Sequence, residues 1–579
     1  MRNELNRRSF LGGTASVLGA ALLPAESFAA SSEAMPEESQ GTHALDQFSR
    51  AYMKTMRAPG MTVGTISGDH TGSRVFGYSD VEAKLPVTAD HPFWIGSICK
   101  SFVGIVCMQL RDEGKLDLQK PILEMMPDLP IVNRFGLITA HHLLTHTSGL
   151  PNWLQLFSCD PTQKAEQQYA PGDTFAYCNL AFDMLGLMIA HLDGRSWPAA
   201  VTARIFKPLG MSGASGQIDD ATQARMPVGY HFQYRDRPNS IVDPLVPVGY
   251  VVMNNAAGSI AATSGDMTRY MSMLLKRGVG PSGRIVSEEG FALFSKPYVK
   301  APVLSPNSSY GYGIGVETID SRTVLRHTGG ATAFASSILV DLDGGVGAFA
   351  SINSMQGYRP NPITQFAVDL LYAEKNGHAA PAPPALADPL DIKHSEDFVG
   401  SYRSPDGSTL KVTAQAKGLT ITTPRGTTNL RPLGSNLFSA AQGSVLDGFG
   451  PAHVPSEFAL AFGRDKSRVV MELSYGSQWY AGEHYQGTAD ATDSAGSERY
   501  AGLYTTDSPW MGAVRIVGRK GKLWLEGLEE MHVQGNDRFT VAGGEGTLEL
   551  KFLSFLNGQA QVLSMDGDVL RRVDLTASR

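Results

Sequence analysis

An alanine- and proline-rich segment, GHAAPAPPALADP at residues 377–389, divides the 579-residue chain into two parts of different character. Proline holds the backbone in an extended form, so this composition is typical of a stiff linker between domains. A chain of this length is also too long to form a single hydrophobic core. We therefore expect separate domains on the two sides of a linker that covers residues 378–393.

The part after the linker contains an internal repeat. FVGSY is matched about a hundred residues later by YAGLY, TLKVTAQAKGLTIT by AVRIVGRKGKLWLE, and GSNLF by GNDRF. Both copies alternate apolar and polar residues, which is the pattern of strands, and turn residues separate the alternating runs. The repeat predicts two small antiparallel β-barrels, at residues 394–490 and 497–579. One irregular β-domain with accidental similarity is the alternative, and the matched order of three segments argues against it.

The part before the linker, residues 45–377, mixes two periodicities. SFVGIVCMQLRDEG and LAFDMLGLMIAHLDG carry apolar residues at helical spacing, and each ends in a glycine, which is a helix stop signal. SSILVDLDGGVGAFASIN contains two short apolar runs around DLDGG, which predicts a β-hairpin. We expect this part to form a domain that contains both helices and sheet.

The first thirty residues have the features of an export signal. NRRSFLGG places two arginines ahead of an apolar stretch rich in Gly and Ala, and the small residues of AESFAA suit a signal peptidase. Paired arginines are typical of the bacterial twin-arginine signal, and an ordinary secretory leader is the alternative. We expect residues 1–30 to be removed and the mature protein to be periplasmic or secreted. No apolar run of 18 residues appears, so we expect no stable membrane anchor.

Charge and cysteine content limit the classes of partner. Lys and Arg number 49 against 56 Asp and Glu, for a net charge of -7, so nothing recommends a nucleic-acid partner. The cysteines form no CxxC pair and no other metal-binding spacing; they are Cys99, Cys107, Cys159 and Cys178. An oxidising compartment permits a disulfide, and free buried thiols are the default expectation. The sequence leaves the disulfide and oligomeric states open.

A serine and a lysine stand one helical turn apart in HPFWIGSICKSF. If Ser97 begins the helix that runs to about Arg111, Lys100 at position i+3 lies on the same face. A buried lysine can remove the proton of a serine hydroxyl, or can tune another base that does so. The helix N-terminus also offers a backbone N–H to a developing oxyanion. The alternative is that Ser97 is only a helix cap.

Two further segments favour catalysis. PGDTFAYCNLAF places Tyr177 and Asn179 just before a helix. A tyrosine beside a lysine can act as a base, because the cation favours the phenolate, and Asn179 can hydrogen-bond a substrate amide. LRHTGGATAF contains four consecutive candidate residues, His327, Thr328, Gly329 and Gly330. Glycines there allow a substrate to approach closely and leave a second N–H for an oxyanion. Singly, Tyr177 fits a core aromatic and His327 a surface turn, but together the segments predict an active site.

The three motifs together resemble those of the penicillin-recognising serine hydrolases, which include class C β-lactamases, D-Ala-D-Ala carboxypeptidases, D-aminopeptidases and related esterases. GKLDL, ITAHHLLTHTSGLPNW, IFKPLGMS and YGYGIG extend the resemblance over roughly residues 45–375. It implies an α/β (α+β) β-lactamase-like catalytic domain, in which helices flank an antiparallel sheet, followed here by the two small antiparallel β-barrels. In such a domain the serine lies in a cleft between an α/β part and a mostly helical part. His146 of THTSGL would then be structural support for this cleft.

The resemblance implies a role for each motif residue. Ser97 attacks a carbonyl carbon and forms an acyl-enzyme, which water then hydrolyses. Lys100 and Tyr177 share the proton transfers, and which of them is the base in each step stays open. Asn179 orients the amide of a small-molecule or peptide substrate. No metal or cofactor is required.

The backbone N–H groups of Ser97 and Gly330 would form the oxyanion hole. The triplet His327, Thr328 and Gly329 stands where many β-lactamases have Lys-Thr-Gly, so it would contact the substrate. Histidine supplies a weaker cation than lysine at neutral pH, which reduces the expectation of efficient penicillin hydrolysis.

Three features resemble those of the D-aminopeptidases: the histidine of the triplet, the tripeptide Tyr-Cys-Asn, and two β-barrels after the catalytic domain. In that group a loop of the last barrel enters the cleft and helps select a free amino group. Glu529 and Glu530 could meet an ammonium, although a solvated acidic turn is the simpler interpretation. We therefore expect cleavage of small D-amino-acid peptides or amides. The alternatives are an esterase, a weak β-lactamase or D,D-carboxypeptidase, or a sensor of cell-wall fragments without turnover.

Overall fold

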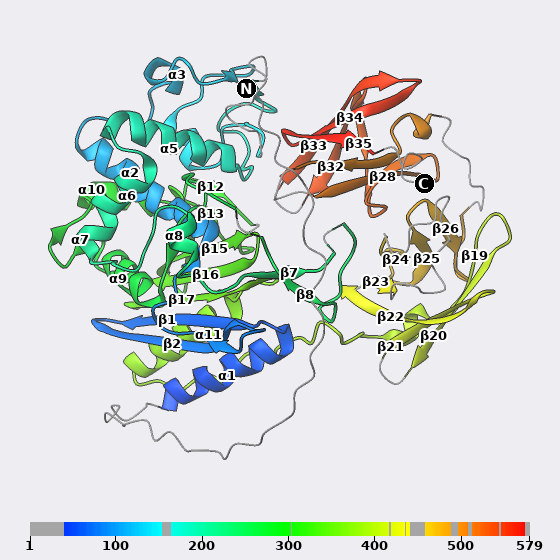
Figure 1. The fold of residues 1–579 in the computed structure, drawn as a ribbon, viewed down its shortest axis with the longest axis horizontal. Helices are drawn as coiled ribbons and strands as arrows, with labels where there is room; N and C mark the ends of the chain where they lie inside the picture. Colours follow the sequence, from blue (N-terminus) through cyan, green and yellow to red (C-terminus); the bar gives the residue numbers. More distant parts are fainter. Residues whose placement is uncertain are drawn as a thin grey trace, which may run out of the picture.

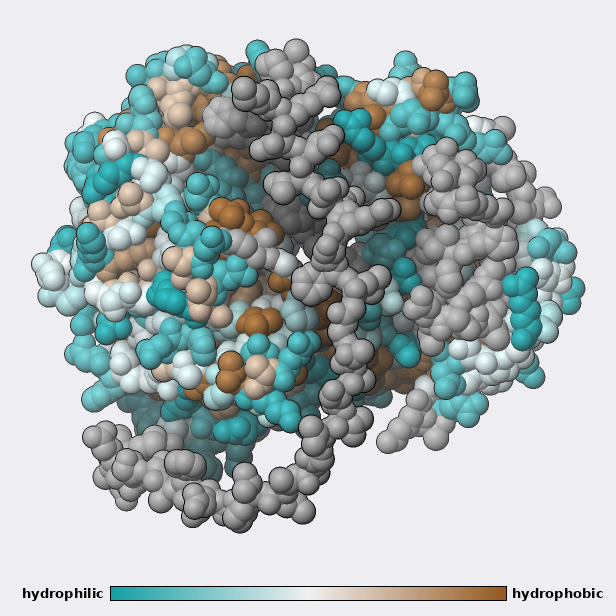
Figure 2. All heavy atoms as spheres, viewed as in Figure 1, coloured by the Kyte–Doolittle hydropathy of each residue, from teal (hydrophilic) through white to brown (hydrophobic). Residues whose placement is uncertain are grey.

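The computed structural model describes residues 40–152, 164–234, 236–249, 251–302, 304–415, 418–434, 436–440, 458–487, 496–507, 512–543 and 546–573. The expected export signal and Cys159 lie outside these ranges. Figure 1 shows a large domain of helices and sheet beside two smaller β-domains. Figure 2 shows hydrophobic side chains in small separate groups on the face in view. Within the described ranges, no helix has the length and apolar character needed to cross a membrane.

A nine-stranded antiparallel sheet forms the centre of the large domain. In spatial order its strands are β12 (Val299–Lys300), β13 (Ser309–Tyr310), β14 (Gly315–Ile319), β15 (Arg322–Ala331), β16 (Phe334–Asp341), β17 (Val346–Ile352), β1 (Gly60–Ser67), β2 (His70–Asp80) and β3 (Leu85–Pro86). The hairpin predicted around DLDGG is β16–β17. The first strand of the chain, β1, pairs with both β17 and β2, so the sheet joins the two ends of this domain.

Helices cover both faces of the sheet (Figure 1). On one face, α1 (Gln40–Met56) and α11 (Asn361–Lys375) pack against residues such as Ala335 and Leu339 of β16. On the other face, Ile338 and Val340 of the same strand join the core of the mostly helical part. Successive strand residues point to opposite faces, so a strand covered on both sides is buried along its whole length, as β16 is.

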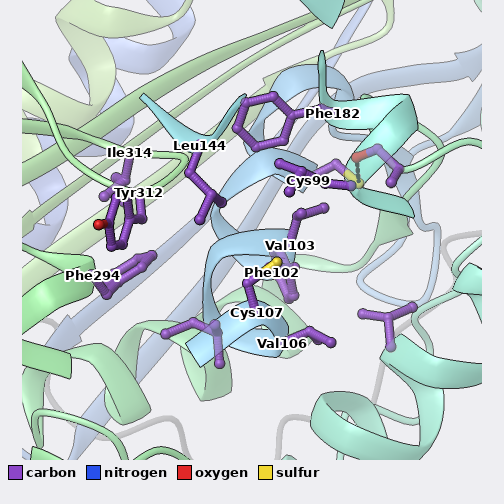
Figure 3. Close-up of a cluster of buried hydrophobic side chains, with 14 of the residues drawn as sticks. Cys99, Phe102, Val103, Val106, Cys107, Leu144, Phe182, Phe294, Tyr312 and Ile314 are labelled. Atoms are coloured by element: carbon purple, nitrogen blue, oxygen red, sulfur yellow. Dashed lines mark hydrogen bonds between the residues drawn. The ribbon is translucent and has the colours of Figure 1, made fainter. Parts of the chain in front are cut away.

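Helix α2 (Cys99–Asp112) runs through the core of the helical part and fixes the segment before it. It ends two residues before Gly114, the stop that the sequence predicts. Phe102 stacks on Tyr270, with ring centroids 3.8 Å apart. Figure 3 shows α2 side chains among residues of several other segments, including Leu144, Phe182, Phe294, Tyr312 and Ile314. Close packing on all sides leaves α2 little freedom to shift.

The other elements of this domain are shorter, apart from two helices. The longer helices are α5 (Asn179–Asp193), as predicted, and α9 (Ser264–Leu275). The short helices are α3 (Ile122–Met125), α4 (Ala140–Leu144), α6 (Trp197–Val201), α7 (Lys207–Leu209), α8 (Asp220–Gln223) and α10 (Glu288–Phe294), with η1 (Gly96–Ile98) and the π-helical η2 (Thr202–Phe206). The short strands are β4 (Phe93–Trp94), β5 (Ile131–Val132), β6 (Ala165–Glu166), β7 (Tyr230–Phe232), β8 (Leu245–Pro247), β9 (Ala261–Ala262), β10 (Val279–Gly280), β11 (Gly283–Arg284) and β18 (Ser354–Met355).

Two antiparallel β-domains follow residues 378–388, which carry no helix or strand. Barrel 1 is closed and consists of β19 (Gly400–Arg403), β20 (Thr409–Gln415), β21 (Gly418–Thr423), β22 (Gly426–Gly434), β23 (Leu437–Ala440), β24 (Leu460–Arg464), β25 (Val470–Tyr475) and β26 (Gln478–Ala481), after η3 (Ser395–Phe398).

Barrel 2 is nearly closed, because only Met531 separates its edge strands β30 and β31. It consists of β27 (Gly502–Thr505), β28 (Ala513–Arg519), β29 (Lys522–Leu525), β30 (Glu529–Glu530), β31 (His532–Gly535), β32 (Arg538–Gly543), β33 (Gly546–Leu556), β34 (Gln559–Met565) and β35 (Asp568–Arg572), after η4 (Ser497–Arg499).

The sequence repeat corresponds to a repeated contact. In barrel 1 the hydroxyl of Tyr402 donates to the carbonyl of Phe398 at 2.8 Å. In barrel 2 the hydroxyl of Tyr504 donates to the carbonyl of Tyr500 at 2.7 Å. The matching segments therefore form the same start of each barrel, a short 3-10 turn tied back by the tyrosine of the first strand.

The two barrels are bound to each other and to the large domain. Arg519 of barrel 2 is buried and donates to the carbonyl of Gly476 in barrel 1 at 2.9 Å. The loop between β7 and β8 forms one ion pair with each barrel: Asp243 with Arg431, and Asp236 with an arginine of β28, Arg515. Figure 1 shows β7 and β8 between the central sheet and the barrels.

Candidate active site

Ser97 lies in η1, directly before α2, where a glycine lets strand β15 approach. Gly96 has a φ of +54°, and a Cβ placed on it would lie 2.7 Å from the backbone nitrogen of Gly330. A Cβ on Gly329 would lie 1.9 Å from the carbonyl oxygen of Ile95. Only glycine fits these positions without displacing backbone. The serine segment and the His-Thr-Gly-Gly segment therefore meet backbone to backbone.

The strand register directs one N–H of β15 towards this contact. Ala331 and Phe334 form the closing pair of the β15–β16 hairpin. In a two-residue hairpin the next pair directs its N–H and C=O groups away from the partner strand, which here concerns Gly330. On its other side β15 pairs with β14 only as far as Arg326. The N–H of Gly330 thus faces the segment of Ser97, as an oxyanion hole formed by the two residues requires.

Lys100 lies one turn after Ser97, and its side chain is fully buried. Its Nζ donates to Ser97 Oγ at 3.0 Å, to Asn179 Oδ1 at 2.7 Å and to the carbonyl of Ala257 at 2.8 Å. Each of these acceptors can take a hydrogen of an ammonium group. Hydrogen bonds to the charged form favour that form, so they offset the effect of burial.

Asn179 is the first residue of α5, and its carboxamide is bound at both ends. The oxygen accepts from Lys100, and Nδ2 donates to Asn152 Oδ1 at 2.9 Å. The same oxygen of Asn152 accepts from the backbone N–H of Asn179 at 2.8 Å. Asn152, within the motif LPNW, is a site residue that the sequence interpretation missed, because only the tertiary contact distinguishes it from a turn residue.

Tyr177 lies between Lys100 and a buried histidine. The Nζ of Lys100 is 4.8 Å from the centre of the Tyr177 ring. On the other side, His146 accepts from the backbone N–H groups on both sides of the tyrosine, with its carbonyl from Ala176 at 2.8 Å and with Nδ1 from Cys178 at 3.0 Å. His146, which the sequence predicts to support the cleft, does so by holding the segment that carries Tyr177.

His327 is a buried neutral imidazole rather than the weak cation that the sequence analysis expected. Its Nδ1 donates to the carbonyl of Thr328 at 2.6 Å, and its Nε2 accepts from the hydroxyl of Tyr310 at 2.9 Å. Burial, and after it the charge of Lys100, lower the pKa of His327 to about 3. A proton on Nε2 would reverse the direction of the hydrogen bond with Tyr310. This position therefore supplies no positive charge to a substrate at neutral pH.

A cavity of about 260 Å³ lies beside His327 and Thr328. Strands β15 and β16 and the start of α11 enclose it, and Arg326, Asn361 and Gln365 are among its lining residues. Ser97, Lys100, Tyr177 and Asn179 are not among its lining residues, so the cavity adjoins the triplet and not the nucleophile.

Barrel 2 reaches the site through the turn between β34 and β35. Asp566 in this turn accepts a hydrogen bond from the backbone N–H of Asn152 at 3.0 Å. Glu529 and Glu530, the acidic pair considered from the sequence, belong to β30 instead. Glu530 pairs with Lys522 of its own barrel at 2.6 Å. Glu530 is therefore paired within its own barrel, in a strand and not in a turn, and no sequence motif marked Asp566.

Three cysteines, Cys99, Cys107 and Cys178, are free buried thiols. Burial raises the pKa of each to about 12. In the described part of the chain, no three His, Cys, Asp or Glu residues lie close enough together to hold a metal ion.

Comparison with known families agrees with this geometry. The family model described as Beta-lactamase matches residues 45–372, which include every motif residue named above. The chain belongs to the β-lactamase family. It is therefore a serine hydrolase with the β-lactamase-like fold.

Relatives within the β-lactamase family carry several names. Penicillin-binding protein 4 of Amycolatopsis lactamdurans is 26% identical over 56% of this chain and 87% of its own. A D-aminopeptidase of Cereibacter sphaeroides is 25% identical over 70% of this chain and 76% of its own. The solved structure of an octameric penicillin-binding protein homologue from Pyrococcus abyssi superposes with a TM-score of 0.52 at 23% identity, and covers 75% of this chain and 98% of that one. These similarities fix the fold and the reaction class and leave the substrate undecided.

Proposed function

We propose that this hydrolase cleaves the amide bond of small D-amino-acid peptides or amides that carry a free amino group, through an acyl-enzyme on Ser97. The observation that carries the proposal is the position of Asp566. This carboxylate of barrel 2 is one hydrogen bond from Asn152, which binds Asn179. An aminopeptidase substrate has a cation beside the bond that is cut, and a carboxylate at the site is the group that recognises it. The D configuration rests on the similarity to D-aminopeptidases.

Barrel 2 carries a second carboxylate beside this turn. Asp568 is two residues after Asp566 and is half-buried. Burial raises the pKa of Asp568 to about 6, and among the described residues no cation pairs with its carboxylate. A desolvated carboxylate becomes more stable when a cation arrives.

The proton transfers follow from the contacts of Lys100. With three acceptors around Nζ, Lys100 serves as the ammonium, and its charge favours the phenolate of Tyr177. Tyr177 then accepts the proton of Ser97 as Oγ attacks the carbonyl carbon, and the N–H groups of Ser97 and Gly330 bind the oxyanion. The proton passes to the departing amine as the C–N bond breaks. Water, deprotonated by the same group, releases the acid and restores Ser97.

Two other activities of this fold fit less well. A β-lactamase or D,D-carboxypeptidase gains from a cation opposite the carboxylate of its substrate, and His327 is neutral here. An esterase substrate has no ammonium group, so it does not need the pairing with a carboxylate that is proposed here for Asp566. A sensor without turnover would not need Lys100 fully bound beside Ser97.

The test measures kcat/KM of the mature enzyme on D-alanine p-nitroanilide, its L-isomer, its N-acetylated form, p-nitrophenyl acetate and nitrocefin. We expect the free D-amine to be preferred over its acetylated form by at least about tenfold. Asp566→Asn should reduce that ratio, while Glu530→Gln, which removes a charge elsewhere in barrel 2, should not. Preference for the acetylated anilide or for nitrocefin would reject the proposal. Labelling of Ser97 by a fluorophosphonate without turnover of any substrate would favour the sensor.

We also propose that residues 1–30 direct export by the twin-arginine route, on the strength of NRRSFLGG. Replacing Arg7 and Arg8 by Lys should leave the enzyme in the cytoplasm with its leader uncleaved. Unchanged export of this variant would instead indicate an ordinary secretory leader.

A further inference from the structure

A continuous series of hydrogen bonds joins barrel 2 to the candidate nucleophile. Asp566 accepts from the N–H of Asn152 at 3.0 Å, and Asn152 Oδ1 accepts from Asn179 Nδ2 at 2.9 Å. Asn179 Oδ1 accepts from Lys100 Nζ at 2.7 Å, and Nζ donates to Ser97 Oγ at 3.0 Å. Every member of the series, from barrel 2 to Ser97, is thus in direct contact with the next.

Asn152 connects the barrel 2 end of this series to the end that carries Lys100 and Ser97. Its side-chain oxygen accepts two hydrogen bonds from Asn179, and its carbonyl accepts from the backbone N–H of Leu180 at 3.1 Å. Its own N–H is directed to Asp566. Two groups of Asn152 therefore hold the first turn of α5, and the third attaches the residue to barrel 2.

The barrel end of the series is held as well. Asp566 has a φ of +49°, within the tight turn that joins β34 and β35. Its backbone N–H donates to the carbonyl of Glu549 in β33 at 3.1 Å. A carboxylate fixed in this way can set the position of the residue that it binds.

We propose that Asp566 and Asn152 are positioning residues for Lys100, so that barrel 2 supports the acylation of any substrate and does not only select amines. Asn179 Oδ1 makes the shortest of the hydrogen bonds to Nζ given above, so displacement of Asn179 would let the ammonium move relative to Ser97. Displacement of a catalytic group by about 1 Å can reduce a rate by on the order of a hundredfold. The inference rests on the Ser97 mechanism of the proposed function but is independent of amine recognition.

The two roles of Asp566 are separable, because one needs its charge and the other only an acceptor oxygen. Asn at position 566 keeps an oxygen that can accept from Asn152 and loses the charge. Gly at this position loses both, and it adopts a φ of +49° without strain. The exposed side chain of Gln559, at the far end of β34, offers a control in the strand that leads to this turn.

The experiment uses full-length mature enzyme and p-nitrophenyl acetate, which has no amino group. We expect Asp566→Gly to lower kcat on the order of tenfold with little change in KM, and to slow labelling of Ser97 by a fluorophosphonate by the same factor. Asp566→Asn should retain most of the ester activity, and Gln559→Ala should equal the wild type. Asn152→Ala should lower kcat at least as much as Asp566→Gly.

Thermal unfolding shows which variants are folded. The inference requires that Asp566→Gly enzyme with a wild-type-like unfolding transition still has the lower kcat on the ester. Equal ester kcat in wild type and folded Asp566→Gly would overturn the inference. So would an equal loss in Asp566→Asn and Asp566→Gly, because the charge alone would then matter. The proposed function fails separately, if Asp566→Asn leaves the preference for a free amine unchanged.

Discussion

The imidazole of His146 packs against the phenol of Tyr177, with ring centroids 4.3 Å apart. His146 is fully buried and has a φ of +57°, a backbone conformation that a residue with a side chain rarely adopts. From this position its carbonyl and its Nδ1 both reach the segment that carries the tyrosine. A strained residue thus holds one of the two candidate proton carriers.

His146→Phe should damage both stability and turnover. The phenyl ring keeps the packing, but the buried N–H of Cys178 loses its acceptor, which destabilises the fold by about 1–3 kcal/mol. We expect kcat to fall more than KM rises, because Tyr177 is no longer fixed beside Lys100. Urea unfolding and steady-state kinetics measure the two effects. Exposed His191 is the control, since His191→Phe should change neither, and an unchanged kcat in His146→Phe would contradict the positioning role.

Ser97→Ala should abolish hydrolysis of every substrate and leave the fold intact. The hydroxyl accepts a hydrogen bond from Lys100, and removal of one oxygen atom leaves the surrounding apolar packing in place. Loss of the covalent route lowers kcat by about 10⁴ or more. Turnover of the best substrate and mass spectrometry of the fluorophosphonate-treated enzyme check this. Wild-type-like turnover or labelling of another residue would exclude the Ser97 acyl-enzyme.

Lys100→Ala and Tyr177→Phe should each be nearly as damaging as loss of the serine, and the double variant little worse than the poorer single one. Lys100 contacts both Ser97 and the Tyr177 ring, so the two side chains form one proton-transfer unit. Members of such a unit are not additive. Measurement of kcat/KM for all four enzymes decides the matter. Losses that multiply would show that the residues act independently.

Stability should depend on pH through Asp183. Burial raises the pKa of this carboxyl from 3.8 to about 7 in the folded protein. Between these values the folded state holds a proton that the unfolded state has lost, so stability falls as the pH rises from about 4 to 7. The full effect is at most about 4 kcal/mol. Asp183→Asn should therefore raise Tm at pH 8 more than at pH 4.

His327 makes stability depend on pH in the opposite direction to Asp183. Its pKa of about 3 in the folded state lies below the ordinary 6.5, so its contribution is complete above pH 6.5 and is lost as the pH falls towards 3. The Tm difference between wild type and Asp183→Asn isolates the carboxyl, since both enzymes keep His327. A difference that does not change with pH would contradict the raised pKa of Asp183.

The sequence by itself determined the features that depend on short spacing. Ser97 and Lys100 meet because three residues make nearly one helical turn. The apolar periodicity of α2 can be read directly from the sequence. The β16–β17 hairpin and the two barrels likewise follow from alternation, turn residues and the repeat that ends in the Tyr402 and Tyr504 contacts.

Only the tertiary structure decided what surrounds these residues. Asn152 and Asp566 are 414 positions apart in the chain, and no periodicity connects them. Ala257 contributes a carbonyl to Lys100, which every residue possesses and no sequence motif marks. The neutral state of His327 depends on its burial and on the nearby charge of Lys100. Local spacing is a property of the backbone, whereas distant contacts, burial and the pKa values that follow from them arise only when the domains pack together.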